Sequence, residues 1–170
     1  MLITDRNSPM IAKNDIKCFK VMVALNGVFY VCPPAYQYFL QNNKLIEYRL
    51  NTLYSEKSND SKKDYRKDGT IGEWFFHTFC DIESALDFIN YLNKKLNNPE
   101  STKHPELYRI PDGAKLVILN ALIPKWSLYY EWTYKEINSE KTYASNKIIY
   151  GDIYVKQKRG HENIPLNLRI

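Results

Sequence analysis

The sequence predicts an α+β fold: a curved, largely antiparallel sheet with one main helix, at about residues 81–97, packed on one face. Three observations predict it. β-Prone runs precede and follow a single long amphipathic segment. An Asn-Gly pair joins two of those runs, which is typical of an antiparallel hairpin. The 170 residues are 44% hydrophobic and 25% charged, a composition in the globular range.

The first expected element is a strand–turn–strand unit. Over residues 16–25 both alternating sets of side chains are largely apolar, which indicates a strand covered on both faces. Asn26-Gly27 then predicts a tight turn into a second strand at 28–32. Pro33-Pro34 ends that strand, because proline has no N–H to donate to a ladder.

Less regular segments lie on either side of this unit. Residues 1–15 lack periodicity and are expected to form an N-terminal arm. Residues 35–54 fit a helical turn in their first part and an alternating, strand-like pattern in their second part. Five basic and four acidic side chains nearly cancel between Glu56 and Asp68, so residues 55–70 are expected to form a charged, solvated loop.

The helix is the clearest element. Residues 74–79 are typical of a short aromatic strand, after which Asp81 is placed to accept the free amides of the first helical turn. Apolar side chains then recur at helical spacing and form one stripe: Ile82, Ala85, Leu86, Ile89, Leu92 and Leu96. Asn97-Asn98-Pro99 ends the helix, because proline cannot continue it.

The second half of the chain is expected to return to strands. A polar linker at 98–113 leads to a buried strand at 115–123, a β-prone aromatic run at 126–134 and a further β-prone stretch at 143–155. A basic C-terminal tail, residues 156–170, follows. We expect a single α+β domain over residues 16–155, since neither half has enough apolar strands to close its own core.

Charge, hydropathy and cysteine content argue against several classes of protein. The net charge is +5 and the isoelectric point about 8.9, but both signs are interspersed, whereas nucleic-acid binders concentrate basic residues on one face or tail. Mean hydropathy is −0.50, and no run approaches the roughly 18 apolar residues of a membrane helix. The N-terminus lacks a signal-peptide pattern. Three widely spaced cysteines suggest neither a disulfide framework nor a metal clamp, and they fit a reducing cytoplasm.

Motifs that would identify an enzyme are absent from the sequence. It contains no GxxxxGK[ST], GxGxxG, HExxH or GxSxG pattern. The three histidines lie in unrelated contexts without ligand spacing, so we predict no metal site and no cofactor. We assign no catalytic residue and favour a role without catalysis.

Four side chains are candidates for a ligand pocket: His77, Lys125, Tyr143 and Ser145. His77 lies beside an expected helix N-terminus, where an imidazole can bind an anion or transfer a proton, although core packing is the commoner role on an aromatic strand. Tyr143 and Ser145 bring hydroxyl groups to a strand entrance, where a turn closed on its own backbone is an equal alternative. Together the four would line a site for a nucleotide-like molecule.

An aromatic contact surface is the second candidate. Tyrosine and tryptophan are favoured at protein interfaces, and residues 126–134 contain five of them. Four are candidate contact residues: Trp126, Tyr129, Tyr130 and Trp132. The alternative is that every second aromatic side chain faces the core. Aromatic residues concentrate in 74–79, 126–134 and 143–154, and they exceed what one helix-on-sheet core needs, which favours a contact surface.

The C-terminal tail contains a further candidate contact. Its basic patch, Lys156, Lys158 and Arg159, could meet phosphates or an acidic protein, and an ordinary solvated tail is the alternative.

Short motifs resemble a group of small uncharacterised proteins of gut Bacteroidetes and their phages, including crAss-like phages. The motifs are Phe76-His77-Thr78-Phe79, Ile123-Pro124-Lys125 with Tyr129-Tyr130, and Tyr143-Ala144-Ser145 with Lys147-Ile148-Ile149. Phe75 and Trp126 stand where those proteins often have glycine. The resemblance implies a phage-borne or phage-derived protein of the bacterial host cytoplasm or the virion, and it brings no established activity.

Three functions follow as expectations. The favoured one is a non-catalytic phage accessory or virion-associated protein that binds a protein partner, or itself, through an aromatic-rich surface. The first alternative is an enzyme or a sequesterer of a nucleotide-like ligand, because the strand–helix–strand order is similar to ADP-ribosyltransferase-like domains. The second alternative is nucleic-acid binding through the C-terminal basic patch.

Overall fold

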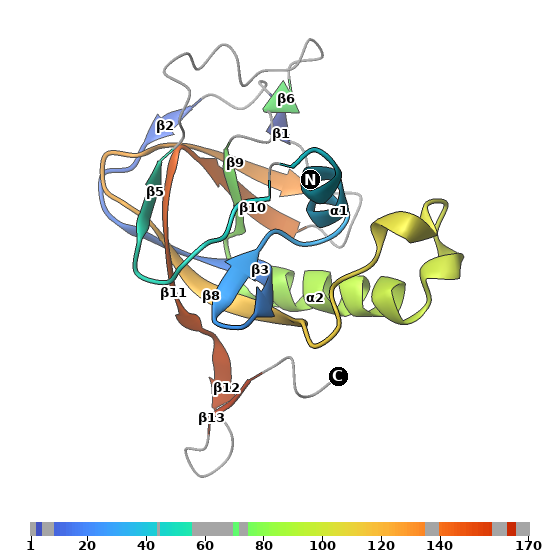
Figure 1. Cartoon of the computed structure of the whole chain (residues 1–170). Helices are drawn as coiled ribbons and strands as arrows, with labels where there is room; N and C mark the ends of the chain where they lie inside the picture. Colours follow the sequence, from blue (N-terminus) through green and yellow to red (C-terminus); the bar gives the residue numbers. More distant parts are fainter. Residues whose placement is uncertain are drawn as a thin grey trace. The chain divides into compact units, whose positions relative to one another are not determined.

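The computed structural model describes residues 3–4, 9–43, 45–55, 70–71, 75–134, 140–157 and 163–165. Its fold is α+β, as predicted, with a largely antiparallel open sheet (Figure 1). The strands of this sheet are β2 (Met10–Ile11), β3 (Ile16–Leu25), β4 (Val28–Tyr30), β5 (Leu53–Ser55), β7 (Phe76–Phe79), β8 (Lys115–Ile123), β9 (Leu128–Tyr134), β10 (Glu140–Ser145) and β11 (Lys147–Ile153). Their order is β2-β9-β10-β7-β3-β8-β11-β5, and β4 pairs with β3.

Two compact units divide the chain. Unit 1 comprises Met1–Lys20, Leu50–Ser84 and Asn120–Gly151. Unit 2 comprises Val21–Arg49, Ala85–Leu119 and Asp152–Ile170. Four of the boundaries fall within β3, β8, β11 and the main helix, α2 (Ile82–Asn97), and the fifth follows Arg49.

Unit 1 is organised by the antiparallel ladder of β9, β10 and β7. Ala144 of β10 lies opposite Tyr130 of β9 and His77 of β7, so these three residues share one face. On that face Tyr130 and Ala144 pack with Phe75 in a buried cluster, and the Tyr130 and Phe75 rings meet edge to face with centroids 5.9 Å apart. The pattern follows from strand periodicity, which sends alternate side chains to opposite faces.

Short strands extend unit 1 at its margins. β2 pairs with β9, with Met10 opposite Tyr129, so part of the expected N-terminal arm belongs to the main sheet. β1 (Ile3–Thr4) pairs with β6 (Thr70–Ile71) in a separate two-stranded sheet. The rest of the charged loop expected at 55–70, residues 56–69, lies outside the described residues.

Unit 2 contains the predicted hairpin and most of α2. Leu25 pairs with Val28, and both turn residues have positive φ angles, 51° at Asn26 and 78° at Gly27. This is the backbone conformation that an Asn-Gly hairpin turn requires. The hairpin prediction is therefore confirmed.

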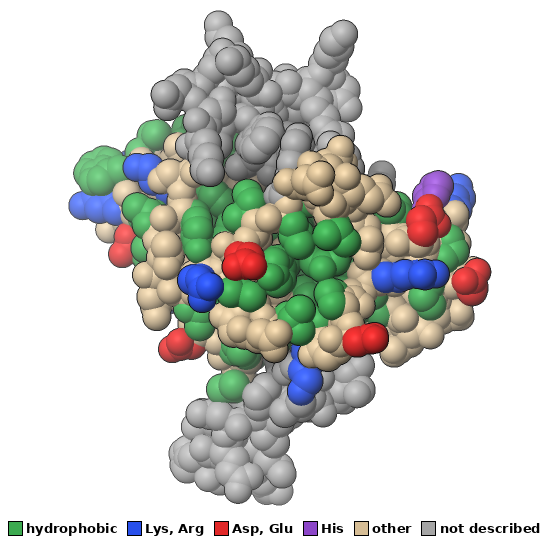
Figure 2. Space-filling model, in the orientation of Figure 1, with side chains coloured by type: hydrophobic (Ala, Val, Ile, Leu, Met, Phe, Trp, Pro, Cys, Tyr) green, Lys and Arg blue, Asp and Glu red, His purple; other side chains and the backbone are tan. Residues whose placement is uncertain are grey.

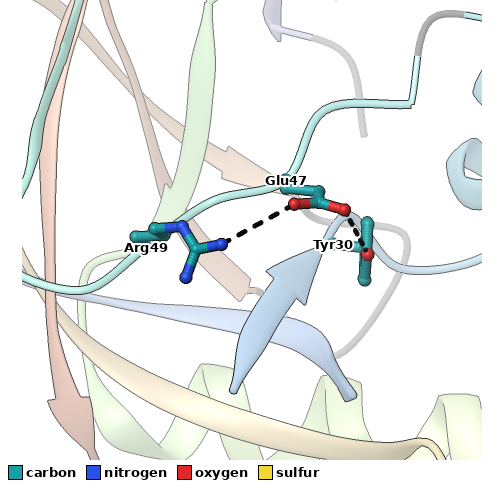
Figure 3. A network of polar contacts seen from close by, with 3 residues as sticks. All are labelled: Tyr30, Glu47 and Arg49. Atoms are coloured by element: carbon teal, nitrogen blue, oxygen red, sulfur yellow. Dashed lines mark hydrogen bonds and ion pairs between the residues drawn. The ribbon is translucent and has the colours of Figure 1, made fainter. Parts of the chain in front are cut away.

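The segment after the hairpin contains a short helix and a polar network. α1 (Ala35–Gln41) follows Pro33-Pro34, and the expected strand in the second part of 35–54 is reduced to a bridge between Tyr48 and Phe29 and the short β5. The Tyr30 hydroxyl donates to Glu47 Oε1 at 3.1 Å, and Arg49 Nη2 lies 3.9 Å from Glu47 Oε2 (Figure 3). Burial, together with the Glu47 carboxylate, raises the pKa of Tyr30.

α2 confirms the sequence prediction at both ends. Asp81 Oδ1 accepts the Ser84 amide at 2.8 Å, which is the expected N-cap contact. In unit 2 the helix buries Ala85, Ile89 and Leu92 and ends at Asn97. The polar linker that follows contains two 3-10 turns, Pro99–Ser101 and Pro105–Leu107.

The last predicted strand is divided in two. β10 starts at Glu140, earlier than expected, and β11 starts at Lys147. Between them Asn146 donates its amide to Leu128 O at 3.1 Å and accepts the Leu128 amide on its side chain at 3.0 Å. β12 (Val155–Gln157) and β13 (Asn163–Pro165) then pair in a small antiparallel sheet in unit 2.

Candidate protein-docking surface

The turn between β8 and β9 holds the most exposed aromatic side chain that the structure describes. Trp126 is 67% exposed, whereas every other described aromatic side chain is buried or half-buried. Its backbone has a φ of 71°, in the left-handed region that bulky residues rarely adopt. The exposed indole is therefore held on a backbone conformation that is unfavourable for tryptophan.

Hydrogen bonds tie this turn to the segment between β2 and β3. The Trp126 amide donates to Ala12 O at 2.7 Å, and the Ala12 amide donates to Ser127 O at 2.9 Å. The Lys125 amide donates to Asp15 Oδ1 at 2.8 Å. Inside the turn, the Ser127 hydroxyl donates to Pro124 O at 2.5 Å. These contacts fix the left-handed backbone at Trp126.

Exposed apolar and basic side chains accompany the indole. Met10 and Ile11 of β2 are 38% and 52% exposed, and β2 is a terminal strand of the sheet order. The Lys125 ammonium lies 5.0 Å from the centre of the Trp126 ring, within cation–π range. We call Met10, Ile11, Lys125 and Trp126 the Trp126 patch. Figure 2 shows hydrophobic and basic side chains together at the left edge, where Figure 1 has β2 and the β8–β9 turn.

The other predicted interface residues of this stretch have different environments. Tyr130 is 1% exposed and belongs to the core, which corrects its assignment to a contact surface. Tyr129 is half-buried and meets the Tyr143 ring edge to face, with centroids 5.8 Å apart. Trp132 has a backbone position in β9, and its side chain lies outside the description.

The four predicted ligand-binding residues do not converge on one site. In the ladder His77 shares a face with Ala144, whereas Tyr143 lies opposite Thr78 and Ser145 opposite Phe76. His77 is therefore on the opposite face of the sheet from Tyr143 and Ser145. Lys125 lies in the β8–β9 turn. The prediction of one pocket lined by all four residues is therefore wrong, because strand register places His77 on the other face from Tyr143 and Ser145.

Ser145 has the alternative role given above, that of a turn residue bonded to its own backbone. Its side chain is fully buried, and the hydroxyl donates to Lys147 O at 2.9 Å, which is a turn closed on its own backbone. His77 is half-buried, and its carbonyl accepts the Lys20 ammonium at 2.6 Å.

A cluster of thiols and hydroxyls that the sequence did not indicate lies on the Tyr143 face. Phe19 of β3 pairs with Phe79 of β7, and continuing this antiparallel register places Cys18 opposite Cys80. Burial raises the pKa of both thiols to about 12, and for Cys80 it outweighs the lowering effect of the Tyr143 hydroxyl. Burial also raises the pKa of Tyr143. Thiols with such pKa values stay protonated at neutral pH and are poor nucleophiles.

The described residues contain neither a metal site nor side chains of the predicted basic patch. No three side chains of His, Cys, Asp or Glu gather there in a way that could hold a metal ion. Lys156 lies in β12, but its side chain, Lys158 and Arg159 are outside the description. Within the described part of the chain, none of the helices combines the length and apolar character that crossing a bilayer requires.

Comparison with known proteins assigns no family: no family model, curated protein or solved structure matches this chain. The geometry of the described residues is therefore the basis for a functional proposal. Among the described residues, the Trp126 patch joins an exposed aromatic side chain, an unusual backbone conformation and a terminal strand.

Proposed function

We propose that this chain is a non-catalytic binding protein that docks a protein partner through the Trp126 patch. The observation that carries the proposal is an indole that is 67% exposed on a backbone with φ of 71°. Bulky residues in sparsely populated backbone regions persist where the surroundings hold them, and such positions concentrate at functional sites. Tryptophan is also among the residues most enriched in the energetic centres of interfaces.

The surroundings of the indole suit an extended, acidic and apolar partner segment. Among the described strands β2 ends the sheet order, and an extended segment can add to such a terminal strand by main-chain hydrogen bonds. Met10 and Ile11 provide apolar contact area on that strand. Lys13 and Lys125 are exposed nearby, and the Asp15 carboxylate is already bonded to the Lys125 amide. Acidic side chains on the partner would complement the two ammonium groups.

The sequence resemblance supports a phage context for this binding. We propose that the partner belongs to the bacterial host cytoplasm or to a virion, and that the chain acts as an accessory or virion-associated protein. A second copy of the chain is a distinguishable outcome of the experiment below, because it would give a cross-linked homodimer.

Site-specific photo-cross-linking in the bacterial host tests the proposal. A photoreactive phenylalanine analogue is placed at Trp126 and, as the matched control, at Leu53 of β5, which is 54% exposed in the same unit. We expect a discrete protein adduct from position 126 and none from position 53. The purified partner should then bind Trp126→Asn about 30-fold more weakly than wild type, as removal of an interface centre predicts. Asparagine tolerates left-handed backbone, so the turn is kept. Leu53→Ala should bind like wild type.

Two outcomes contradict the proposal. One is the absence of any protein adduct specific to position 126. The other is a partner whose affinity is unchanged by Trp126→Asn. Co-purification of a nucleotide or nucleic acid that is retained equally by Trp126→Asn would replace the proposal with one of the two alternatives.

A further inference from the structure

Two cysteine side chains that are distant in sequence are neighbours in unit 1. Cys18 lies in β3, Cys80 follows the last residue of β7, and both are free thiols in the structure. The pairing of Phe19 with Phe79 places Cys18 directly opposite Cys80. Burial is the main cause of the raised pKa of Cys80, and Cys18 adds to it, so the two thiols lie within electrostatic range of each other.

The hydrogen bonds of β7 show which kind of opposite pair the two cysteines form. The Cys80 amide donates to Lys141 O at 3.0 Å, toward β10, so the backbone of Cys80 points away from β3. In an antiparallel ladder such a non-hydrogen-bonded pair has the shorter separation, about 4.5 Å between Cα atoms. Disulfides span Cα separations of about 4.4–6.8 Å. Cys18 and Cys80 can therefore be joined with little movement of the backbone.

The two thiols differ in their access to solvent. Cys18 is 1% exposed, whereas Cys80 is half-buried and keeps contact with solvent. A small reagent therefore meets Cys80 first, and Cys18 is positioned to react with the product from within the sheet. Because burial raises the pKa of both thiols, the thiolates are scarce at neutral pH and the reaction is slow there.

We propose that Cys18 and Cys80 form a reversible disulfide between β3 and β7 when the chain meets small disulfides in an oxidising medium. The Cys80 thiolate, its proton lost to water, attacks one sulfur of the small disulfide, and one thiolate leaves. The Cys18 thiolate, likewise deprotonated, then attacks the Cys80 sulfur and expels the second thiolate. The two protein thiols lose two electrons, and the small disulfide is reduced to two thiols.

The bond would make the stability of unit 1 depend on the redox state of the surroundings. It joins positions that are far apart in sequence, and a link of this kind stabilises the folded protein mainly by constraining the unfolded chain. A reducing compartment keeps the two thiols apart, whereas an oxidising medium closes the bond. The proposal does not depend on docking through the Trp126 patch.

Oxidation of the full chain with 2-hydroxyethyl disulfide at about pH 9, where thiolates are more abundant, tests the pairing. The chain is then digested with trypsin without reduction, which leaves Cys18 in peptide 18–20, Cys32 in 21–44 and Cys80 in 68–94. From the folded chain we expect the link between 18–20 and 68–94 to exceed the link between 18–20 and 21–44 about tenfold or more. In urea the second link should predominate, because the shorter loop closes more readily.

Single cysteine variants test the order of the two steps. Cys18→Ala should stop at a mixed disulfide on Cys80, whereas Cys80→Ala should leave the buried Cys18 unmodified in the folded chain. Cys32→Ala, at a buried thiol of unit 2, is the matched control and should form the link like wild type. Oxidation should raise the melting temperature of wild type by about 5–10 °C, and dithiothreitol should reverse the rise. Cys18→Ala should show no such rise.

Three results would overturn the proposed disulfide. The first is the absence of the 18–80 link from the folded chain under conditions in which the chain in urea forms links. The second is the same distribution of links with and without urea, and the third is a folded chain in which links to Cys32 are as abundant. The comparison of folded and unfolded wild type needs no variant, so it stays decisive if a variant does not fold. None of these results bears on cross-linking at Trp126.

Discussion

Trp126 and Tyr130 lie four residues apart in one aromatic stretch, and their environments are opposite. Trp126 is 67% exposed in a turn, whereas Tyr130 is 1% exposed in a strand. Tyr130 points where β-strand alternation and the pairing with Ala144 send it, onto Phe75. Trp126 lies before the first residue of β9, so strand alternation does not set its direction. The turn sets it instead, and the hydrogen bond from the Trp126 amide to Ala12 O holds that turn.

The difference shows that aromatic content alone does not reveal a binding surface. A tyrosine in register with the core stabilises the fold, while a tryptophan placed by a left-handed turn stays exposed and is the residue that we propose for docking. The predictions that follow test this contrast, from the largest expected effect to the smallest.

Replacement of Tyr130 should have the largest effect. Tyr130→Ala removes a fully buried ring from its contact with Phe75 and should lower the free energy of unfolding by about 3–5 kcal/mol. Tyr129→Ala, at the neighbouring half-buried position, should lower it clearly less. Urea unfolding followed by circular dichroism measures both variants. Equal losses of unfolding free energy would show that the two faces of β9 contribute equally to stability.

Cys18, on the face of the ladder that carries Tyr143, should make the stability of the protein depend on pH. The pKa of Cys18 is raised by burial from its ordinary value of 9.0 to about 12, so the folded protein holds this proton more tightly than the unfolded chain. The resulting stability is complete below about pH 9 and is lost as the pH rises toward 12, by at most about 1.4 kcal/mol per pH unit. Urea unfolding of wild type and Cys18→Ala across this range measures it. A difference between the two proteins that does not change with pH would contradict the assignment.

The smallest effect concerns the backbone of the turn. Trp126→Gly relieves the left-handed conformation at a largely exposed site, and the gain is partly offset by the greater freedom of glycine in the unfolded chain. We expect a net stabilisation of about 1 kcal/mol or less, measured by thermal unfolding. Lys125→Gly, one residue earlier, should instead destabilise by about 0.5–1 kcal/mol. Equal losses in both variants would show that Trp126 is not strained.

Elements with strong local signals were predicted well from sequence. The hairpin turn at Asn26-Gly27, the cap at Asp81 and the end of α2 at Asn97 are each specified by residues within a few positions. β8, Lys115–Ile123, has the expected bounds because Pro124 follows an apolar run that only Asn120 interrupts.

Features set by pairing between distant segments were not predictable in this way. The division at Asn146 depends on its two hydrogen bonds to Leu128, since the residues on both sides are β-prone. The same holds for the candidate sites. Spacing alone could not separate His77 from Tyr143, nor bring Cys18 opposite Cys80, because one position of register exchanges the faces of a strand.

The bonds between the β8–β9 turn and the start of the chain have a consequence for the order of folding. Lys125 and Asp15, which they join, are 110 residues apart in sequence. During synthesis Met10 and Ile11 therefore leave the ribosome long before β9 exists to pair with them, and a two-residue strand cannot hold its place alone. Because such distant contacts form only after a large loop is closed, the contacts that hold the β8–β9 turn are completed late in folding.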